Sequence, residues 1–460
     1  MNKIVKLMLL LAGMTFAQTY TLEECIALAV ANNHEIQKSQ QNLKNSESQV
    51  SEAWGNVYPE LSFNAKYEYA HEQYNPLAGG GGTSPFVNSG TFIDTNSANY
   101  NAPTAALAGD IGNLFNGLGN SMVNDYQVNA SLVLTQVLFS QAAWTAPSIA
   151  VSYKKMVAEE HAQLVNKIKY EVSQSFYTVL YFSEAVTVMN EGIGQAHKHL
   201  EQAEVMHAAG LVSEIDLLRA TINVKDLDVD KEKMNRDLIM AKNGLLNKMG
   251  ESYSSDISIT GTLEKKIIQG SKESLYEIAL SKRRELRQLQ FGKELAGHGV
   301  TIARADYFPT LYAGGSYTKL SVGNEWNSFE WNNDVRIFAG VQWNLFNGLK
   351  TKEKVVQAKT EVTKMDISVD RIKKGIKLQI ESEWDKLQEA ANRIDVRNNL
   401  IALTNKSEAM ISASYSVGKA TQLEVLDAEL DMRKAKLDYQ KALLDYTLAY
   451  LALQMATGTF

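Results

Sequence analysis

The chain has 460 residues, with 46 Lys and Arg against 52 Asp and Glu, and a formal net charge of −6 at pH 7. This charge argues against a nucleic-acid partner, because such a partner favours a basic surface. The only cysteine, Cys25, excludes a disulfide within the chain, and the two glutamates directly before it argue against a lipid-attachment site.

Residues 1–17 have the pattern of a secretory signal peptide. Lys3 and Lys6 precede an apolar run from Leu7 to Leu11, and the small residue Ala17 suits a cleavage site. An uncleaved anchor helix is the alternative, but the apolar run is too short to cross a bilayer. Further along, no stretch of about 18 consecutive apolar residues occurs, so entry into a membrane would require a closed β-barrel.

The remainder of the chain contains two related copies. We predict a first repeat at 18–250 and a second at 271–460, joined by a connecting segment at 251–270. Matching positions lie 250 residues apart before the strands and 207 or 208 apart after them. They are Glu35-Ile36 with Glu285-Leu286, Leu138-Phe139 with Leu345-Phe346, Gly210 with Gly418, and Gly250 with Gly458. The first copy therefore carries an insertion, at 71–123, whose Gly, Pro, Asn and Ser content is typical of a surface loop.

Each copy is predicted to contain two β-strands, at 60–70 and 125–138 in the first and at 309–320 and 332–345 in the second. Residues 61–69 alternate between apolar and polar side chains, over a length close to the ~9–11 residues that a tilted membrane strand needs. In the second copy one face is expected to hold Thr310, Ser316, Thr318, Arg336, Gln342 and Asn344.

The same alternation would fit two half-buried hairpins of a soluble domain. Membrane strands are favoured because Tyr and Trp lie near the strand ends and because the strands interrupt very long helices. The smallest bacterial barrels have ~8 strands, so four strands must combine with those of other copies. A trimer would supply twelve.

Long helices are predicted because no proline lies between 148 and 308 or after 309. We expect continuous helices at 141–208 and 349–415, each roughly 100 Å long, followed by helices at 213–249 and 421–457. A further helix opens each copy. The last helix has leucines every seven residues from Leu423 and alanines every seven from Ala428, which favours a neighbour on each side. From the helices alone, a plain antiparallel coiled coil is the alternative.

Several short segments together resemble one known family. They are Thr21-Leu22-Glu23-Glu24 with Asn32-Asn33-His34-Glu35, Val137-Leu138-Phe139-Ser140, Trp343-Asn344-Leu345-Phe346-Asn347-Gly348, and the turns Ala209-Gly210-Leu211-Val212 and Tyr415-Ser416-Val417-Gly418. In this order and spacing they resemble the TolC family of outer-membrane channels, although the family usually has proline at His34 and at the strand exits. The resemblance implies a fold that is mainly α with membrane β. Three copies would form a 12-stranded outer-membrane β-barrel continuous with a 12-helix periplasmic α-barrel, and the connecting segment would lie in a band around it.

The resemblance further implies a passive exit duct in the cell outer membrane, surrounded by outer-membrane lipid. Such ducts export substrates delivered by an inner-membrane RND or ABC pump and a periplasmic adaptor, as in drug efflux and type I secretion. No enzyme activity, metal or cofactor is expected, since His197 and His199 point away from each other on a helix and no nucleophile motif occurs. The alternative is a secreted periplasmic or surface coiled-coil scaffold or adhesin with no channel activity.

Two groups of site residues are expected at the helix turns. Gly210 and Gly418 stand where each helical hairpin reverses, a position that favours positive φ. The resemblance implies that these turns bind the adaptor, through Gly210, Leu211, Val212, Val417 and Gly418.

The second group is an entrance gate. Glu424 and Asp427 are three residues apart and share a helix face. Acidic residues on a helix commonly form only a solvated face, but the resemblance places these two in acidic rings that would make the entrance cation-selective. It also assigns Asp216 and Tyr415 to gate-linking positions. Ala420 stands where a family member has a locking arginine, so the closed state is expected to have fewer polar links.

Overall fold

The computed structural model describes residues 19–69, 126–253, 257–266, 270–323 and 330–460. The predicted signal peptide and the loop insertion lie outside these residues. The chain divides into two compact units. Among the described residues, the helical unit holds those within Met1–Leu43, Val157–Leu289 and Ser368–Phe460, and the strand unit holds those within Lys44–Met156 and Gln290–Ile367.

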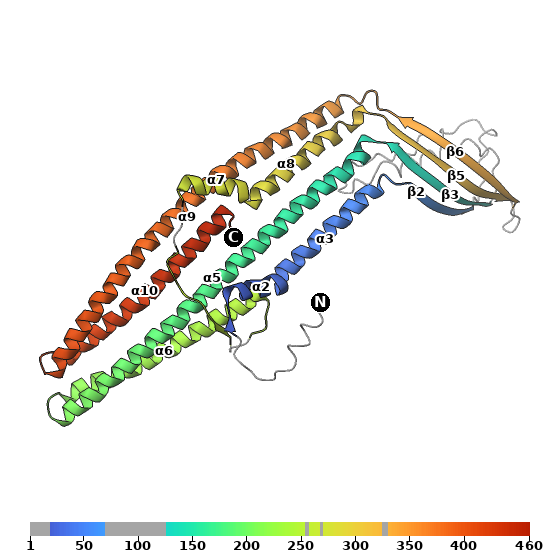
Figure 1. Ribbon diagram of the computed structural model, residues 1–460. Helices are drawn as coiled ribbons and strands as arrows, with labels where there is room; N and C mark the ends of the chain where they lie inside the picture. Colours follow the sequence, from blue (N-terminus) through green and yellow to red (C-terminus); the bar gives the residue numbers. More distant parts are fainter. Residues whose placement is uncertain (1–18, 70–125, 254–256, 267–269, 324–329) are drawn as a thin grey trace, which may run out of the picture. The chain divides into compact units, whose positions relative to one another are not determined.

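The two copies share one order of elements (Figure 1). The first copy contains α2 (Leu22–Asn32), α3 (His34–Gly55), β2 (Glu60–Tyr69), β3 (Tyr126–Phe139), α5 (Gln141–Ala208) and α6 (Glu214–Met249). The second contains α7 (Lys272–Lys282), α8 (Arg284–Ala303), β5 (Thr310–Gly323), β6 (Glu330–Gln342), α9 (Lys350–Ser416) and α10 (Gln422–Thr457). The predicted duplicated architecture of long helices and four strands is therefore confirmed.

The single helix expected at the start of each copy is divided in two. Asn33 interrupts the first helix and Arg283 the second, each with extended backbone, at φ −63 and ψ 127 or 123. Strand β6 ends at Gln342, before the predicted end at 345. The cause is that its partner strand β5 begins at Thr310, which pairs with Gln342. Residues after Gln342 therefore have no neighbouring strand with which to form hydrogen bonds.

The strand unit holds one antiparallel sheet with the order β2-β3-β5-β6. Register aligns apolar side chains in rows across the sheet, and one row contains Phe63, Leu132, Tyr317 and Val335. These four side chains are 66%, 43%, 41% and 70% exposed, so this face has no cover within the described chain. The row Asn64, Ser131, Thr318 and Asp334, on the other face, is polar.

The helical unit contains two helical hairpins, α5–α6 and α9–α10, whose turns lie at the same end (Figure 1). Helix α10 contributes to two apolar clusters. Leu444 and Leu451 pack with residues of α2, α5 and α6, whereas Ala442 and Leu453 pack with residues of α7 and α9. This two-sided burial agrees with the two heptad stripes in its sequence. In the described residues, none of the helices is both long and apolar enough to span a membrane.

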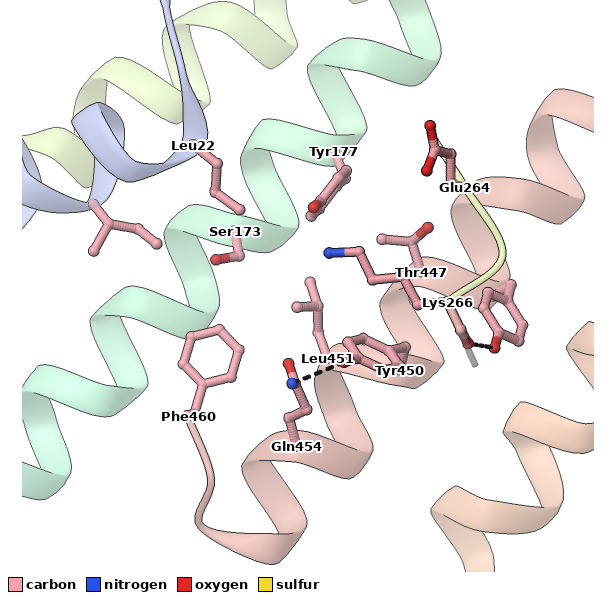
Figure 2. Close-up of a pocket in the computed structure, with 12 residues that line it drawn as sticks. Leu22, Ser173, Tyr177, Glu264, Lys266, Thr447, Tyr450, Leu451, Gln454 and Phe460 are labelled. Atoms are coloured by element: carbon pink, nitrogen blue, oxygen red, sulfur yellow. Dashed lines mark hydrogen bonds between the residues drawn. The ribbon is translucent and has the colours of Figure 1, made fainter. Parts of the chain in front are cut away.

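The connecting segment and the chain ends meet in the helical unit. Short strands β1 (Thr19–Tyr20) and β4 (Ser258–Ile259) pair in parallel, so the start of the described chain is held by the segment between the copies. At the other end, the ring of Phe460 packs edge-on against Tyr170, with centroids 5.7 Å apart. Helix α2, the connecting segment and the C-terminus also line one cavity of about 170 Å³ (Figure 2).

The side chains around this cavity are mostly apolar and aromatic, with polar groups from three elements. Those labelled in Figure 2 are Leu22, Ser173, Tyr177, Glu264, Lys266, Thr447, Tyr450, Leu451, Gln454 and Phe460. Lys266 Nζ lies 5.8 Å from the centre of the Tyr450 ring, and Gln454 Nε2 donates to the Tyr450 hydroxyl at 3.1 Å. The cavity is thus part of the packing that fixes the connecting segment on α5 and α10.

Candidate functional site at the helix tips

Both hairpin turns end their first helix in the same way. Gly210 and Gly418 have φ of +71° and +72°, as the sequence predicted. The amide of Gly210 donates to the carbonyl of His207, and the amide of Leu211 donates to that of Met206. The Gly418 turn repeats the pattern with Tyr415 and Ser414 as acceptors. These paired bonds satisfy helix-end carbonyls and require a left-handed residue, which glycine provides without a Cβ clash.

The second helix of each hairpin begins with a capping box. The Ser213 hydroxyl donates to Asp216 at 2.7 Å, and the Thr421 hydroxyl donates to Glu424 at 2.9 Å. In return each hydroxyl accepts from the backbone amide of its partner. Asp216 and Glu424 therefore occupy equivalent positions, one in each copy. At this position the positive end of the helix dipole stabilises a carboxylate.

The carboxylate of Glu424 is fixed and charged. Hydrogen bonds from the backbone and side chain of Thr421 hold the pKa of Glu424 below its usual value. Asp427 lies one turn further along α10, and both side chains are exposed. The structure thus presents two acidic groups on one exposed face next to the Gly418 turn, while Ala420 in that turn offers no charge.

Each turn exposes an apolar side chain next to its glycine. Leu211 is 71% exposed and Val417 is 67% exposed, whereas Val212 is half-buried. Because most of the surface of both side chains is exposed, both are available to another molecule.

The structure places Tyr415 differently from the exposed acidic groups. Its side chain is 2% exposed, and its hydroxyl has no hydrogen-bond partner among the described residues. Burial raises the pKa of Tyr415, and the nearby charge of Asp216 adds to the effect. Asp216 is therefore near enough to Tyr415 to act on it electrostatically, but no hydrogen bond between the two is seen in the described chain.

A buried ionisable pair beneath the tips was missed by sequence reasoning. Nε2 of His199 on α5 lies 3.3 Å from Oε1 of Glu429 on α10, and the two side chains are 7% and 5% exposed. The histidine ring is also 6.3 Å from that of Tyr415. The sequence contained a weak signal for this burial. Gln422 and Glu429 are one heptad apart, and both lie at the same heptad position as the buried Leu443.

In the part of the chain that the structure describes, no group of three or more His, Cys, Asp or Glu side chains is arranged to hold a metal ion. The single cysteine is fully buried, and burial raises the pKa of the Cys25 thiol to about 11. A neutral thiol in a packed cluster is a structural residue rather than a reactive one.

Comparison with known proteins agrees with this geometry. Residues 25–251 and 275–459 match the family described as "Outer membrane efflux protein". The outer membrane protein TolC of Salmonella enteritidis is 20% identical over 431 residues, which cover 90% of this chain and 77% of that protein.

Two solved structures share the fold. A membrane protein from Pseudomonas aeruginosa has a TM-score of 0.71 at 15% identity, covering 95% of this chain and 93% of that one. The outer membrane protein VceC from Vibrio cholerae has a TM-score of 0.70 at 15% identity, covering 95% and 96%. The scaffold or adhesin alternative is not supported. Two family matches, one in each copy, span most of the chain, which thus belongs to the outer membrane efflux protein family and is an efflux channel of the outer membrane rather than an enzyme.

Proposed function

We propose that three copies of this chain form a closed duct through which an inner-membrane pump of the RND or ABC class, joined by a periplasmic adaptor, expels its substrates. The observation that carries the proposal is the open edge on each side of the four-stranded sheet. In the described chain β2 and β6 each pair on one side only. An unpaired edge with an apolar, exposed face is unstable alone in water or in lipid.

Pairing β6 of one copy with β2 of the next removes every edge. Three copies of four strands make a barrel of twelve, which exceeds the ~8 strands of the smallest bacterial barrels. The apolar rows then face the lipid, and the polar rows line the duct. Interfaces of this head-to-tail kind close into a ring when the rotation between copies is a third of a turn.

The helices support the same assembly. On α6, Ile215, Ile222 and Val229 recur every seven residues and are 62%, 57% and 65% exposed. On α9 the exposed residues Val396, Leu403 and Met410 also recur every seven, and exposed Val417, in the turn directly after α9, continues the spacing. Exposed heptad stripes of this length call for a partner helix. Because the two stripes lie on different helices, the α9 stripe of one copy can pack on the α6 stripe of the next.

The tips are the proposed meeting point with the pump assembly. The two turns expose Leu211 and Val417 beside Gly210 and Gly418, and with Val212 they form the proposed adaptor-binding surface. In the ring, Glu424 and Asp427 of three copies would place six carboxylates at the periplasmic entrance. Their summed field would favour cations there, and Asp216 and Tyr415 would link the two hairpins of each copy at the gate.

The assembly is tested by the mass of the purified full-length protein in detergent, for wild type, Leu403→Asp and the matched control Asn405→Asp. Asn405 is exposed and lies about 200° around the helix from Leu403. A trimer mass for wild type and control, with dissociation of Leu403→Asp, supports the proposal. A wild-type monomer, or a Leu403→Asp trimer as stable as the control, contradicts it.

A further inference from the structure

Glycine and aromatic residues alternate between strands β5 and β6 on one face of the sheet. Tyr312 of β5 pairs with Gly340 of β6, and in the next pair on that face Gly314 of β5 pairs with Phe338 of β6. Each ring therefore has a glycine directly opposite it on the neighbouring strand. These four residues share the face of the polar row that contains Thr318, because positions two apart along a strand point to the same side.

The far end of each ring occupies the space above the opposite glycine. A Cβ placed on Gly340 would lie 2.3 Å from both Cζ and the hydroxyl oxygen of Tyr312, and a Cβ on Gly314 would lie 2.5 Å from Cζ of Phe338. Side chains on a strand ordinarily stand roughly perpendicular to the sheet. Tyr312 and Phe338 instead lie across the strand pair, with their rings against the sheet.

The burial of the two rings agrees with this arrangement. Phe338 is half-buried, although it lies on β6 at the edge of the sheet, where its neighbour Ile337 is 90% exposed. Tyr312 is also half-buried, and on its other side it pairs with Val137 of β3, which is 6% exposed. The rings thus cover backbone and neighbouring side chains instead of extending freely from the sheet.

Backbone conformation does not account for the two glycines. Neither Gly314 nor Gly340 is among the described glycines with positive φ. Glycine inside a strand weakens it, because it has no side chain to pack. A ring that covers a glycine on the neighbouring strand makes up for this loss. The role left for Gly340 is to provide the space that the Tyr312 ring occupies.

Gly314 has a second constraint, which makes Gly340 the better position for a test. A Cβ on Gly314 would also lie 2.4 Å from the backbone carbonyl oxygen of Leu134, so a larger residue there would displace β3. At Gly340 the three atoms nearest to a Cβ all belong to the Tyr312 ring. A substitution at Gly340 therefore acts on the ring first.

Both pairs lie near the end of the sheet from which the helices continue. Strand β5 begins at Thr310, two residues before Tyr312, and β6 ends at Gln342, two residues after Gly340. In the proposed duct the polar face lines the bore. Three copies would then place six such rings around the base of the barrel.

We propose that Gly340 and Gly314 hold the rings of Tyr312 and Phe338 flat against the inner wall and thereby keep the channel wide at the base of the barrel. This inference rests on the proposed trimeric duct. Twelve strands about 4.8 Å apart and tilted by about 40° place the backbone only about 12 Å from the axis. Rings that stood toward the axis from every copy would narrow this bore, and bulky substrates would be the first to be excluded.

Gly340→Ala is the variant that should release the Tyr312 ring. Its methyl group would lie far inside the ordinary contact distance of about 3.5–4.0 Å, and the end of a side chain moves more readily than backbone. The matched control is Gly315→Ala, on the opposite face of β5. There the atom nearest to a Cβ is the carbonyl oxygen of Arg336 at 3.4 Å, so no side chain has to move.

Unfolding of the full-length protein in detergent tests the contact between ring and glycine without relying on channel activity. Tyr312→Ala is introduced into wild type, Gly315→Ala and Gly340→Ala, and the thermal midpoints are compared. We expect Tyr312→Ala to lower the midpoint equally in the first two and much less in Gly340→Ala, where the ring has already left its place. An equal shift in all three overturns the proposal.

Polymer exclusion in planar bilayers tests the width of the bore. Polyethylene glycols of graded mass are added on the side opposite the helices, and those that enter the duct lower its conductance. We expect the size cut-off to shift to smaller polymers in Gly340→Ala, to return to the wild-type value when Tyr312→Ala is added, and to stay unchanged in Gly315→Ala.

The outcomes separate the held ring from the duct itself. A cut-off that Gly340→Ala leaves unchanged overturns the proposal. A smaller cut-off that Tyr312→Ala does not restore also overturns it, because the glycine would then shape the strand and not hold the ring. A wild type that never conducts contradicts the duct, and the unfolding midpoints then decide whether Gly340 holds the ring of Tyr312.

Discussion

Asn33 and Arg283 form equivalent side-chain hydrogen bonds in the two copies. The side-chain amide of Asn33 donates to the backbone carbonyl of Lys248 at 3.0 Å, and Nε of Arg283 donates to that of Ala456 at 2.7 Å. Each residue thus ties the break between two short helices to the C-terminal end of the last helix of its own copy. Asn33 and Arg283 stand 250 positions apart, as do the repeats at this point, although one side chain is an amide and the other a guanidinium.

Asn33→Ala should destabilise the helical unit by about 1–3 kcal/mol. The substitution removes the donor to Lys248 and also the cap of α3, because Asn33 Oδ1 accepts from the amides of Glu35 and Ile36. Asn33→Asp is the matched variant, which keeps the acceptor and loses only the donor. Thermal or denaturant unfolding in detergent should order the proteins as wild type, Asn33→Asp, Asn33→Ala. A milder effect for Ala than for Asp would contradict the dual role.

Gly250→Ala should be far more damaging than Gly210→Ala, although both glycines have φ near +72°. The strain of a left-handed alanine costs about 1–2 kcal/mol at either position. At Gly250 a Cβ would also stand 2.6 Å from the carbonyl oxygen of Asn32, whereas nothing lies within 4 Å of a Cβ at Gly210. The Gly250 clash is with backbone, which cannot rotate away, so about 1–3 kcal/mol more is expected. Unfolding midpoints of the two variants measure the difference, and equal midpoints would refute it.

The helix breaks at Asn33 and Arg283 are features of the fold that the sequence pattern did not predict. Strands and long helices follow from local periodicity and from the distribution of proline, and they were predicted correctly. The breaks contain neither Pro nor Gly, and the residues that hold them open, at Lys248 and Ala456, are distant in sequence. Periodicity therefore continues through the break, and only the tertiary contact reveals it.

Lowering the pH below about 4.5 should weaken the start of α10. Hydrogen bonds from Thr421 lower the pKa of Glu424 from its usual 4.5, so this stabilisation is present above that value and is lost as the carboxylate becomes protonated in the folded protein. Glu424→Gln removes the titrating carboxylate and with it the pH dependence, whereas Thr421→Ala removes only the hydroxyl and leaves the backbone amide as a donor. Hydrogen exchange at residues 421–428 as a function of pH follows the change, and an acid response that persists in Glu424→Gln would assign it to another group.

Glu424→Ala combined with Asp427→Ala should abolish block of the channel by multivalent cations. Both carboxylates are exposed on one face of α10, and the proposed ring brings three such pairs to one entrance, where their fields add. Single-channel recordings with increasing concentrations of a multivalent cation measure the effect. Asp431→Ala, an exposed acid one turn beyond Asp427, is the control that should retain block. Equal block in all three proteins would show that the acidic pair does not line the entrance.

The residues of the proposed entrance illustrate how much of a site can be predicted from a sequence. The turn glycines and both capping carboxylates follow from local pattern, since Ser213 with Asp216 and Thr421 with Glu424 have capping spacing. The pair of His199 and Glu429 does not. A glutamate on a helix is usually solvated, and its burial depends on the approach of α5 to α10, which are separated by the whole second set of strands.

Ile337→Lys should prevent insertion of the barrel, whereas Thr318→Lys should not. Ile337 is 90% exposed and lies on the apolar face of β6, as Val335 does. In the proposed barrel this face contacts the hydrocarbon of the bilayer. A lysine on the lipid face near the bilayer centre costs ~2–4 kcal/mol per copy, and the trimer repeats that cost three times. Thr318 lies on the polar face, paired with Ser131 and Asp334, where a lysine would stay hydrated and near an acid. Recovery of each variant in the outer-membrane fraction after a high-salt wash distinguishes them. Both substitutions add the same side chain to neighbouring strands. Loss of both variants from the outer-membrane fraction would mean that an added lysine is not tolerated on either face of the sheet. Loss of Thr318→Lys alone would reverse the assignment of the two faces.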